Sequence, residues 1–377
     1  IAFRLSYEDT TRPYLAKLPF VRRFLALNLL WVLKEKSIRN VLAINLGGIG
    51  DVLFSTPALR ALKELYPNAE ISMLLDPKTR EIAAGLPYVA DTYIFHGGSS
   101  AVAGLWNLPG NMKTLLALRK KRFDLALNMR TLASAAGAFK MKMLLAAIGP
   151  KVTAGRNTEG RGVFFDITVF ETDKGEKHEM EYDLELAVKL GAKSYDKEID
   201  YEFGYEAVEK ARKVLMEAAI ADNDIVIGVH PGGKPSHRWP IENFAEAMRQ
   251  IRGDVNCSFV VTGNDEEASL ADDLIRSSGV KAINTAGRFT INELGAMIKR
   301  CSVFISNDTA AMHIAALAKI PVVAIFGPGF LTKVDPRAIS DKVAVLYKKA
   351  GCAPCNKKKC ETKDCLKTIL PREAAEA

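Results

Sequence analysis

Short apolar runs alternate with longer mixed segments through the first half of the chain. Continuous apolar runs are typical of parallel strands buried on both faces, and the mixed segments between them are typical of helices that cover such a sheet. The predicted strands are "NVLAINL" (40–46), "AEISMLL" (69–75), "DTYIF" (91–95) and "FDLALNM" (123–129), and the predicted helices span 56–66, 111–121, 133–148 and 178–191. This order predicts an α/β unit built on a parallel sheet.

The second half repeats the pattern. Its predicted strands are "DIVIGVHPGG" (224–233), "CSFVVTG" (257–263), "SVFISND" (302–308) and "PVVAIFGPG" (321–329), and its predicted helices span 241–252, 265–278, 291–301 and 309–319. Residues 195–203 contain few long apolar runs and are predicted to link the two halves. Ligands bind outside the carboxyl ends of the strands in such sheets, so two facing units predict a site in the cleft between them.

An apolar segment with interleaved basic residues precedes the first strand. Pro19 is expected to break it, which leaves a helix from about residue 20 to 36. This helix either packs on the first domain or lies on an anionic membrane surface. We therefore divide the chain into four parts, namely a basic amphipathic segment (1–39), a first domain (40–203), a second domain (204–345) and a cysteine-containing tail (346–377).

The charge balance limits the classes of partner that the protein is expected to bind. The formal net charge is +8, which favours nucleotides, phosphates, acidic lipid head groups or nucleic acid. The basic residues follow no pattern interleaved with aromatic residues, which disfavours nucleic acid. The sequence predicts neither a membrane-spanning helix nor a cleavable signal.

A glycine turn follows the first strand, in "NLGGIGD". Gly47, Gly48 and Gly50 allow the backbone to approach a ligand closely. The turn matches neither GxGxxG nor GxxxxGK[ST], which disfavours a nicotinamide oxidoreductase. Asp51 ends the turn, where it either caps the following helix, a contribution of roughly 1 kcal/mol, or takes a proton in the cleft. Spacing alone favours the cap.

The loop "HPGGKPSHRWP" (230–240) concentrates positive charge before a helix that is expected to begin near Pro240. Lys234, His237 and Arg238, beside free backbone N–H groups, are suited to binding a diphosphate. The alternative is a basic surface loop.

A second candidate anion site lies in "SNDTAAMHIAAL" (306–317). Asp308 or Thr309 can cap the predicted helix, and the small side chains of Ala310 and Ala311 keep its first turn open to a ligand. His313 follows on the same helix, either in contact with the ligand or as a hydrogen-bonded core histidine.

An acidic cluster ends another strand of the second half, in "TGNDEE" (262–267). Carboxylates at such a position suit ribose hydroxyls in nucleotide-binding folds, and Asp265 is the candidate. An ordinary acidic helix start explains the cluster equally well.

Four cysteines lie close together near the end of the chain. Cys352, Cys355, Cys360 and Cys365 have the spacing C-x2-C-x4-C-x4-C, which allows four thiolates to reach one tetrahedral zinc ion. Zinc fingers separate their two CxxC pairs more widely, so a surface segment that binds no metal is the alternative.

Taken together and in order, these motifs resemble the ADP-heptose:lipopolysaccharide heptosyltransferases, glycosyltransferase family nine. The resemblance rests on "INLGGIGDVLFSTPALRALKELYPNAEI", "HPGG…HRWPIENFAE", "VVTGNDEE", "TAGRFTINELGAMIKRCSVFISNDTAAMHIAAL", "PVVAIFGP" and the cysteine-bearing tail. It implies a GT-B fold, with two Rossmann-like doubly wound parallel-sheet domains that face each other across a cleft. The first domain would bind the acceptor and the second the sugar nucleotide.

The resemblance also implies roles for the candidate residues. Asp51 stands at the position of the catalytic base of an inverting transferase, which reverses the preference for a simple cap. Lys234, Arg238 and the backbone amides of Thr309, Ala310 and Ala311 would stabilise the departing ADP, Asp308 and His313 would contact the donor, and Asp265 would reach the ribose. The chain departs from the family at His237, where lysine is frequent, and at Ala310, where glycine is frequent. No cofactor is expected for the transfer.

The implied substrates are ADP-heptose and the lipid A–core oligosaccharide acceptor. The enzyme would be cytoplasmic and peripheral on the inner face of the bacterial inner membrane, where its positive charge suits the anionic surface. Three alternatives remain, namely a GT-B transferase for another sugar nucleotide, a hydrolysing or epimerising relative, and a non-catalytic nucleotide-sugar-binding protein on the same scaffold.

Overall fold

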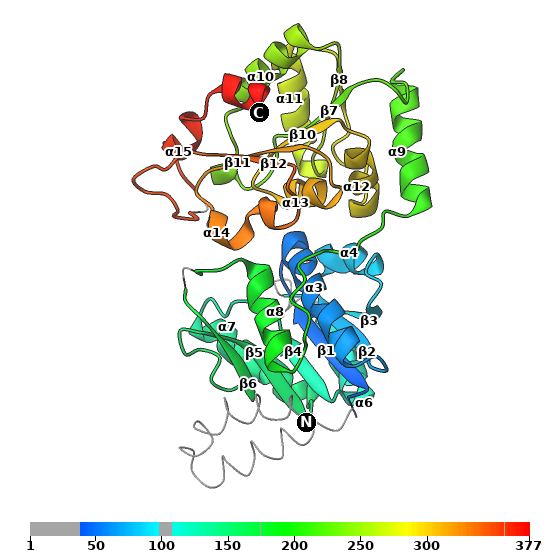
Figure 1. Cartoon of the computed structure of the whole chain (residues 1–377), viewed down its shortest axis with the longest axis vertical. Coiled ribbons are helices and arrows are strands. Elements are labelled where there is room, and N and C mark those ends of the chain that lie inside the picture. Colours follow the sequence, from blue (N-terminus) through cyan, green and yellow to red (C-terminus); the bar gives the residue numbers. More distant parts are fainter. Residues whose placement is uncertain (1–37, 98–107, 174, 358) are drawn as a thin grey trace.

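Each half of the chain forms one six-stranded parallel sheet, and the two sheets belong to two lobes that stack end to end (Figure 1). The computed structural model describes residues 38–97, 108–173, 175–357 and 359–377. The predicted segment 1–39, apart from its last two residues, lies outside the described residues. In the N-terminal lobe the strand order is β3-β2-β1-β4-β5-β6. The strands are β1 (Asn40–Asn45), β2 (Glu70–Leu75), β3 (Val89–Ile94), β4 (Leu125–Asn128), β5 (Val152–Thr158) and β6 (Ile167–Glu171).

The central strand β1 shows why its apolar run is continuous. Val41 and Ala43 contribute to the core on one face of the sheet, and Leu42 and Ile44 contribute to the core on the other. All four side chains are completely buried. A strand covered on both faces therefore needs apolar residues at consecutive positions.

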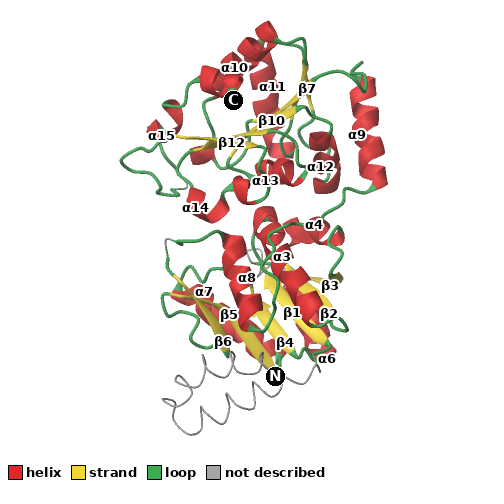
Figure 2. Ribbon diagram, viewed as in Figure 1, coloured by secondary structure: helices red, strands yellow, loops and turns green. Residues whose placement is uncertain are grey.

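Helices cover both faces of this sheet (Figure 2). Helices α3 (Ile49–Leu65) and α8 (Glu179–Lys189) pack against each other on one face, and α6 (Leu108–Lys121) and α7 (Ala135–Ile148) pack against each other on the opposite face. The short helix α4 (Arg80–Ala84) follows β2. Within the described residues, no helix is both long and apolar enough to span a membrane.

The C-terminal lobe repeats the topology, with the order β12-β11-β10-β7-β8-β9. Its strands are β7 (Val226–His230), β8 (Ser258–Val261), β9 (Ala282–Asn284), β10 (Val303–Asn307), β11 (Val322–Phe326) and β12 (Val343–Tyr347). Its helices are α9 (Tyr205–Glu217), α10 (Ile241–Asp254), α11 (Ala268–Ser278), α12 (Ile291–Lys299), α13 (Ala310–Leu317), α14 (Leu331–Val334), α15 (Asp364–Lys367) and α16 (Pro371–Glu376). Read in chain order within each lobe, both sheets have the Rossmann order 3-2-1-4-5-6.

The residues after β12 complete the C-terminal lobe. Helix α16 packs against α10, and Leu366 and Ile369 are completely buried. The indole N–H of Trp239 donates a hydrogen bond to the carbonyl of Ile369 at 3.1 Å. The tail thus belongs to the core of this lobe, while the four-part division of the chain stays a prediction.

One predicted helix begins in the wrong place. Helix α3 starts at Ile49 rather than at residue 56, so Pro57 lies inside it and not in its first turn. Pro57 has no N–H to donate to the carbonyl of Leu53, and the hydroxyl of Thr56 bonds to that carbonyl instead. The glycine turn is therefore continuous with the first turn of the helix.

The two lobes are joined by buried contacts as well as by the chain. A single apolar core includes residues of both lobes. Across the lobes, the carboxylate of Glu81 accepts hydrogen bonds from the backbone N–H groups of Ile291 and Asn292, both at 3.0 Å. The Phe54 ring packs edge-on against the His313 ring, with 4.9 Å between their centroids. The ends of both sheets are thereby held together.

Candidate active site

A cavity of about 590 Å³ lies between the lobes, at the carboxyl ends of both sheets. Its N-terminal wall is formed by the first turn of α3 and by the loop after β4. Its C-terminal wall is formed by the loop after β7, the start of α13 and helix α14. A cavity therefore lies where the sequence predicted the cleft, and it has one wall from each lobe.

Asp51 lies in this cavity with its carboxylate between two donors. Its Oδ2 atom accepts a hydrogen bond from the backbone N–H of Gly48 at 2.7 Å, and its Oδ1 atom forms an ion pair with the guanidinium of Arg130. The side chain keeps 24% of its surface exposed. Asp51 is the third residue of α3, and Gly48 rather than Asp51 holds the N-cap position. One oxygen thus serves the helix start, while the carboxylate still faces the cavity.

The glycines of the turn keep the surroundings of Asp51 open. A Cβ on Gly47 would collide with the Asp51 carboxylate and with Arg130. A Cβ on Gly50 would lie 2.9 Å from the His313 ring of the opposite lobe, which is too close. Gly48 and Gly50 line the cavity, whereas Gly47 lies behind the carboxylate.

Buried polar groups hold the start of α3 in place. The Asn45 side chain, at the end of β1, donates to the carbonyl of Asp51 and to the hydroxyl of Ser55, both at 2.8 Å. The Ser55 hydroxyl also contacts Asp183 of α8 at 3.0 Å, and Asp183 pairs with the buried guanidinium of Arg156. The backbone of Asp51 is therefore positioned by groups from β1, β5 and α8.

The C-terminal wall presents an uncapped helix start. Thr309 holds the N-cap position of α13, but its hydroxyl contacts Ser306 at 3.3 Å and makes no capping bond. The first N–H groups of a helix have no partner within it and carry about half a positive charge in effect. Thr309 and Ala310 line the cavity, whereas Ala311 is buried beside it. This helix start can receive an anion.

Asn307 connects the helix start to the basic loop. Its amide donates to the carbonyls of Pro231 and Gly232 at 2.9 and 3.0 Å, and its oxygen accepts from the backbone N–H of Trp239 at 2.9 Å. These bonds bring the loop after β7 beside the start of α13, so that Lys234 lines the same cavity.

Burial controls the charges of three predicted donor residues. It lowers the pKa of His237 to about 4 and the pKa of His313 to about 3, so both rings are neutral at pH 7. It also raises the pKa of Asp308 to about 6, although the nearby Lys234 opposes the shift. All three line the cavity. Among the predicted basic residues of this loop, Lys234 is therefore the cation that faces the cavity.

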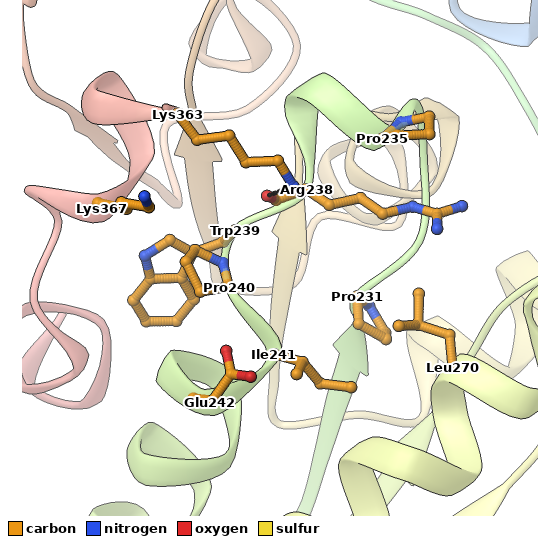
Figure 3. Close-up of a pocket in the computed structure, with 10 residues that line it drawn as sticks. All are labelled: Pro231, Pro235, Arg238, Trp239, Pro240, Ile241, Glu242, Leu270, Lys363 and Lys367. Carbon is orange, nitrogen blue, oxygen red and sulfur yellow. Dashed lines mark hydrogen bonds between the residues drawn. The ribbon is translucent and has the colours of Figure 1, made fainter. Parts of the chain in front are cut away.

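Two predicted donor residues lie elsewhere. Arg238 lines a different pocket, of about 410 Å³, together with Pro235, Leu270 and others (Figure 3). Its guanidinium pairs with Glu267 at 3.1 Å and donates to the carbonyl of Gly233 at 2.7 Å. Asp265 is exposed in the turn after β8 and does not line the cavity. The charge of Arg238 is therefore already paired with the Glu267 carboxylate, which the sequence analysis did not name as its partner. Through these two contacts Arg238 stabilises the loop after β7.

Two basic residues of the cavity were missed in the sequence. Arg130 follows β4 at the carboxyl end of its strand, and this position in a parallel sheet was the available signal. Lys333 of α14 extends from the C-terminal lobe to Glu171 and Glu179 of the N-terminal lobe, at 3.2 and 3.3 Å. No local pattern marks Lys333, because its partners are distant in the sequence.

The cysteine cluster does not support the zinc prediction. Among the residues that the structure describes, no group of three or more His, Cys, Asp and Glu side chains is arranged to hold a metal ion. Cys365 is buried on α15, Cys352 is exposed, and Cys355 is partly exposed. The thiol of Cys360 accepts a hydrogen bond from the backbone N–H of Lys363 at 3.4 Å. Burial and the nearby thiols of Cys352, Cys360 and Cys355 raise the pKa of Cys365, but the described side chains are not arranged as a metal site.

Comparisons with known proteins identify a family and a fold. The family model described as glycosyltransferase family 9 (heptosyltransferase) matches residues 112–366. The chain is 26% identical to lipopolysaccharide heptosyltransferase 3 of Escherichia coli K12 over 282 residues, which cover 74% of this chain and 79% of that protein. It is 24% identical to lipooligosaccharide heptosyltransferase 2 of Campylobacter jejuni over 340 residues, covering 87% and 94%.

A solved structure shares the fold. The ADP-heptose lipopolysaccharide heptosyltransferase II of E. coli superposes with a TM-score of 0.70 at 20% identity, covering 89% of this chain and 96% of that one. The expected GT-B architecture is therefore confirmed. Because the family model matches well over half of its length, the chain belongs to glycosyltransferase family 9, the heptosyltransferases, and is a glycosyltransferase.

Proposed function

We propose that this glycosyltransferase moves heptose from ADP-heptose to an acceptor of the lipopolysaccharide inner core, with inversion at the anomeric carbon. One observation carries the proposal. Asp51 on one lobe and the uncapped start of α13, with Lys234, on the other lobe line the same cavity. A base and an anion site that face each other are the two parts that glycosyl transfer needs.

Asp51 is the proposed general base. As the acceptor hydroxyl attacks the anomeric carbon, its proton passes to the Asp51 carboxylate, a C–O bond forms and the bond to the diphosphate oxygen breaks on the opposite side. Attack from the side opposite the leaving group inverts the configuration. Oδ2 stays bound to Gly48, and Arg130 keeps the carboxylate directed into the cavity.

The C-terminal lobe is proposed to stabilise the departing ADP. Negative charge develops on the diphosphate as the bond breaks, and preorganised donors at that position lower the barrier. The amides at the start of α13 and the ammonium of Lys234 are the candidate donors. Asp308, with its oxygens beside the same turn, is proposed to accept hydrogen bonds from donor hydroxyls.

The names of the relatives support the proposal that ADP-heptose is the donor and that the lipopolysaccharide core is the acceptor. The curated relatives at 24–26% identity are lipopolysaccharide and lipooligosaccharide heptosyltransferases, and two solved structures of similar fold are described with ADP and with an ADP-heptose analogue. We propose the same donor and acceptor class here, without a further cofactor. Because such an acceptor is built on the cytoplasmic face of the inner membrane, we propose that the enzyme acts there as a peripheral protein.

The decisive experiment is Asp51→Asn, which keeps the shape of the side chain and removes its basicity. We expect kcat to fall by at least about 10²-fold, the usual scale of a general base, while the Kd for ADP changes little because the nucleotide contacts the other lobe. Steady-state kinetics with ADP-heptose and calorimetry with ADP measure the two effects. Unchanged turnover would exclude Asp51 as the base.

A nucleotide panel tests the donor separately. Only a ligand that binds the native state raises its melting temperature, so ADP should stabilise the protein more than UDP, GDP or CDP at equal concentration. Preference for another nucleotide would indicate a GT-B transferase with a different donor. Nucleotide binding without any transfer to an acceptor would favour a non-catalytic binding protein.

A further inference from the structure

The cysteine-bearing tail reaches the catalytic cavity through one residue. Asn356 lies in the loop between β12 and α15, inside the cluster "CAPCNKKKC", and it lines the cavity between the lobes. The four cysteines of the tail, all of which the structure describes, do not line it. The tail motif therefore contributes an amide, and not a thiol, to the candidate active site.

Two backbone hydrogen bonds hold Asn356 at this position. The N–H groups of Cys355 and Asn356 both donate to the carbonyl of Pro328, at 3.0 and 2.8 Å. Pro328 follows β11 and directly precedes Gly329, which lines the cavity. Asn356 has a φ of 46°, in the left-handed region that asparagine adopts more readily than most residues. The turn at Asn356 is thus tied to the loop after β11.

The tail is packed on both sides of this turn. Before it, Ala350 and Ala353 pack against the apolar core of the C-terminal lobe. After it, Cys365 and Leu366 are buried in the same core. Asn356 is therefore presented to the cavity by a turn whose two ends are fixed.

The tail also contacts the loop after β7 at two neighbouring residues. The side chain of Asn356 forms a hydrogen bond with that of His237. The ammonium of Lys363 donates to the backbone carbonyl of Arg238 at 3.4 Å (Figure 3). The tail and the loop after β7 therefore build one wall of the cavity together.

Asn356 lies on the side of the cavity that contains Asp308. A Cβ on Gly329 would collide with the Asp308 carboxylate and would lie 3.9 Å from the His237 ring, so these two side chains are close neighbours. Asn356 is bonded to that ring and lines the same cavity. An amide and a carboxylate thus lie near each other on the C-terminal wall.

The amide of Asn356 has hydrogen-bonding groups to offer a ligand. An asparagine side chain can donate two hydrogen bonds and accept two, and within the part of the chain that the structure describes its one partner is His237. A neutral group that both donates and accepts suits sugar hydroxyls, which do the same, better than a diphosphate, which only accepts. Lys234 and the uncapped start of α13 already supply donors for a diphosphate.

We propose that Asn356 binds the transferred sugar of the donor, with hydrogen bonds between its amide and the sugar hydroxyls, and that it shares this role with Asp308. The cysteine-bearing tail then serves to build one wall of the donor site. This inference rests on the proposed function, because it assigns a residue to the sugar of the same donor. Asn356 contributes binding and specificity and takes no part in proton transfer.

The test is Asn356→Gly, with calorimetric titrations of ADP-heptose and of ADP, both without acceptor. Glycine adopts the left-handed backbone without strain, so this variant removes the amide and keeps the turn. The Kd for ADP-heptose should rise by about tenfold, the scale of one or two lost hydrogen bonds. The Kd for ADP, which lacks the heptose, should change by less than about threefold.

Ala219→Gly is the matched control. Ala219 lies in the same lobe, is exposed, has a φ of 53° and does not line the cavity. Its change to glycine makes the same kind of backbone substitution away from the site, so both Kd values should equal those of wild type.

Two results would overturn the inference. Equal weakening of ADP-heptose and of ADP by Asn356→Gly would show that the amide acts only by supporting the loop after β7. Unchanged Kd values for both ligands would show that Asn356 does not contact the sugar. Since both ligands are titrated into the same variant, a loss of stability does not disturb the comparison.

Steady-state kinetics give a second measurement. Loss of a contact that the sugar makes in both the ground state and the transition state should raise the KM for ADP-heptose more than it lowers kcat. A fall in kcat at unchanged KM would contradict a binding role for Asn356.

The proposed function can fail separately from this inference. A wild-type protein that prefers another nucleotide would reject ADP-heptose as the donor, and the same pair of titrations with that sugar nucleotide would then decide the role of Asn356. A wild-type protein that binds and transfers heptose, beside an Asn356→Gly variant with unchanged Kd and KM values, would reject this inference and sustain the proposed function.

Discussion

At the scale of single residues, the candidate active site depends on glycines, which have no side chain to fill the space between the lobes. Gly48 and Gly50 both line the cavity, but a Cβ would meet very different surroundings at the two positions. At Gly48 the nearest atom would be an oxygen of Asp51 at 3.5 Å, which is ordinary contact. At Gly50 it would be the His313 ring of the other lobe at 2.9 Å. The close approach of the lobes thus requires glycine at residue 50.

This difference gives a matched pair of variants. Gly50→Ala should lower kcat/KM by about tenfold or more, because the added methyl group separates α3 from the buried His313 ring and a misplacement of this size is costly in catalysis. Gly48→Ala should stay close to wild type. Steady-state kinetics of both variants provide the measurement, and equal activity of the two would contradict the steric explanation.

A second prediction at this scale concerns the diphosphate. His237 is neutral at pH 7, so Lys234 carries the charge of its loop toward the cavity. Lys234→Met should raise the Kd for ADP by about tenfold or more, the usual range for a charge-assisted hydrogen bond. Arg238→Met should lower the melting temperature, because it removes the ion-pair partner of the buried Glu267, and should change the Kd for ADP by less than about threefold. Calorimetric titration with ADP decides between these assignments. A larger rise in Kd for Arg238→Met than for Lys234→Met would indicate that Arg238, and not Lys234, binds the diphosphate.

At the scale of elements, helix α14 links the lobes through one side chain. Lys333 is 12% exposed and lies among Thr131, Glu171 and Glu179 of the other lobe. Together with Arg156 and Arg130, it outweighs the effect of burial and lowers the pKa of Glu179 to about 2. The N-terminal lobe therefore presents buried carboxylates that the C-terminal lobe helps to neutralise.

Removing the charge of Lys333 should lower the stability of the protein. Lys333→Met is expected to lower the free energy of unfolding by roughly 3 kcal/mol, because it leaves buried carboxylates undercompensated. The control is Lys319→Met. Lys319 pairs with Glu198 at 2.9 Å, but both side chains are more than half exposed, so its loss should cost less than about 1 kcal/mol. Thermal unfolding of the two variants gives the comparison, and equal melting temperatures would show that the Lys333 contacts contribute little.

At the scale of the whole molecule, four buried histidines couple the fold to pH. Burial lowers the pKa of His178, His230 and His237 to about 4 and that of His313 to about 3. An unfolded histidine titrates near 6.5, so the unfolded chain binds more protons than the native chain between pH 6.5 and about 4. Stability is therefore lost as the pH falls through this window. Asp308, whose pKa burial raises to about 6, and Asp183, whose pKa burial also raises, oppose this trend with two carboxylates against four histidines.

The melting temperature should accordingly fall between pH 7 and pH 5. His178 accepts a hydrogen bond from the backbone N–H of Met180 at 3.2 Å, and protonation would remove that acceptor. In His178→Asn the amide oxygen keeps the cap but does not titrate, so the fall in melting temperature should be shallower than in wild type. Identical slopes in the two proteins would exclude His178 as a contributor.

The fold was largely predictable because it depends on local chemistry. The buried strands β1, β2, β4, β7, β8, β10 and β11 are continuous apolar runs, and the predicted ranges overlap all of them. The pattern missed β5, β6, β9 and β12. In β5 and β6 the buried polar residues are Arg156, Thr158 and Glu171. These polar side chains are buried as a charged network with α8, and an apolar run cannot signal a strand of that kind. The start of α3 was predicted seven residues too late, because Pro57 is typical of a first helical turn. In the structure Pro57 lies inside the helix, where the hydroxyl of Thr56 bonds to the carbonyl that lacks a backbone N–H partner.

What the sequence determined by itself is the repeated α/β pattern, the glycine turn before Asp51 and the order of motifs that indicates the family, because each depends on residues that are neighbours in the chain. Only the tertiary structure decided which charges face the cavity. Arg238 is paired with Glu267, and Lys333 and Arg130 enter from distant segments. Whether a charge is free to meet a ligand depends on its partners in space, and those partners lie up to 202 residues away in the sequence.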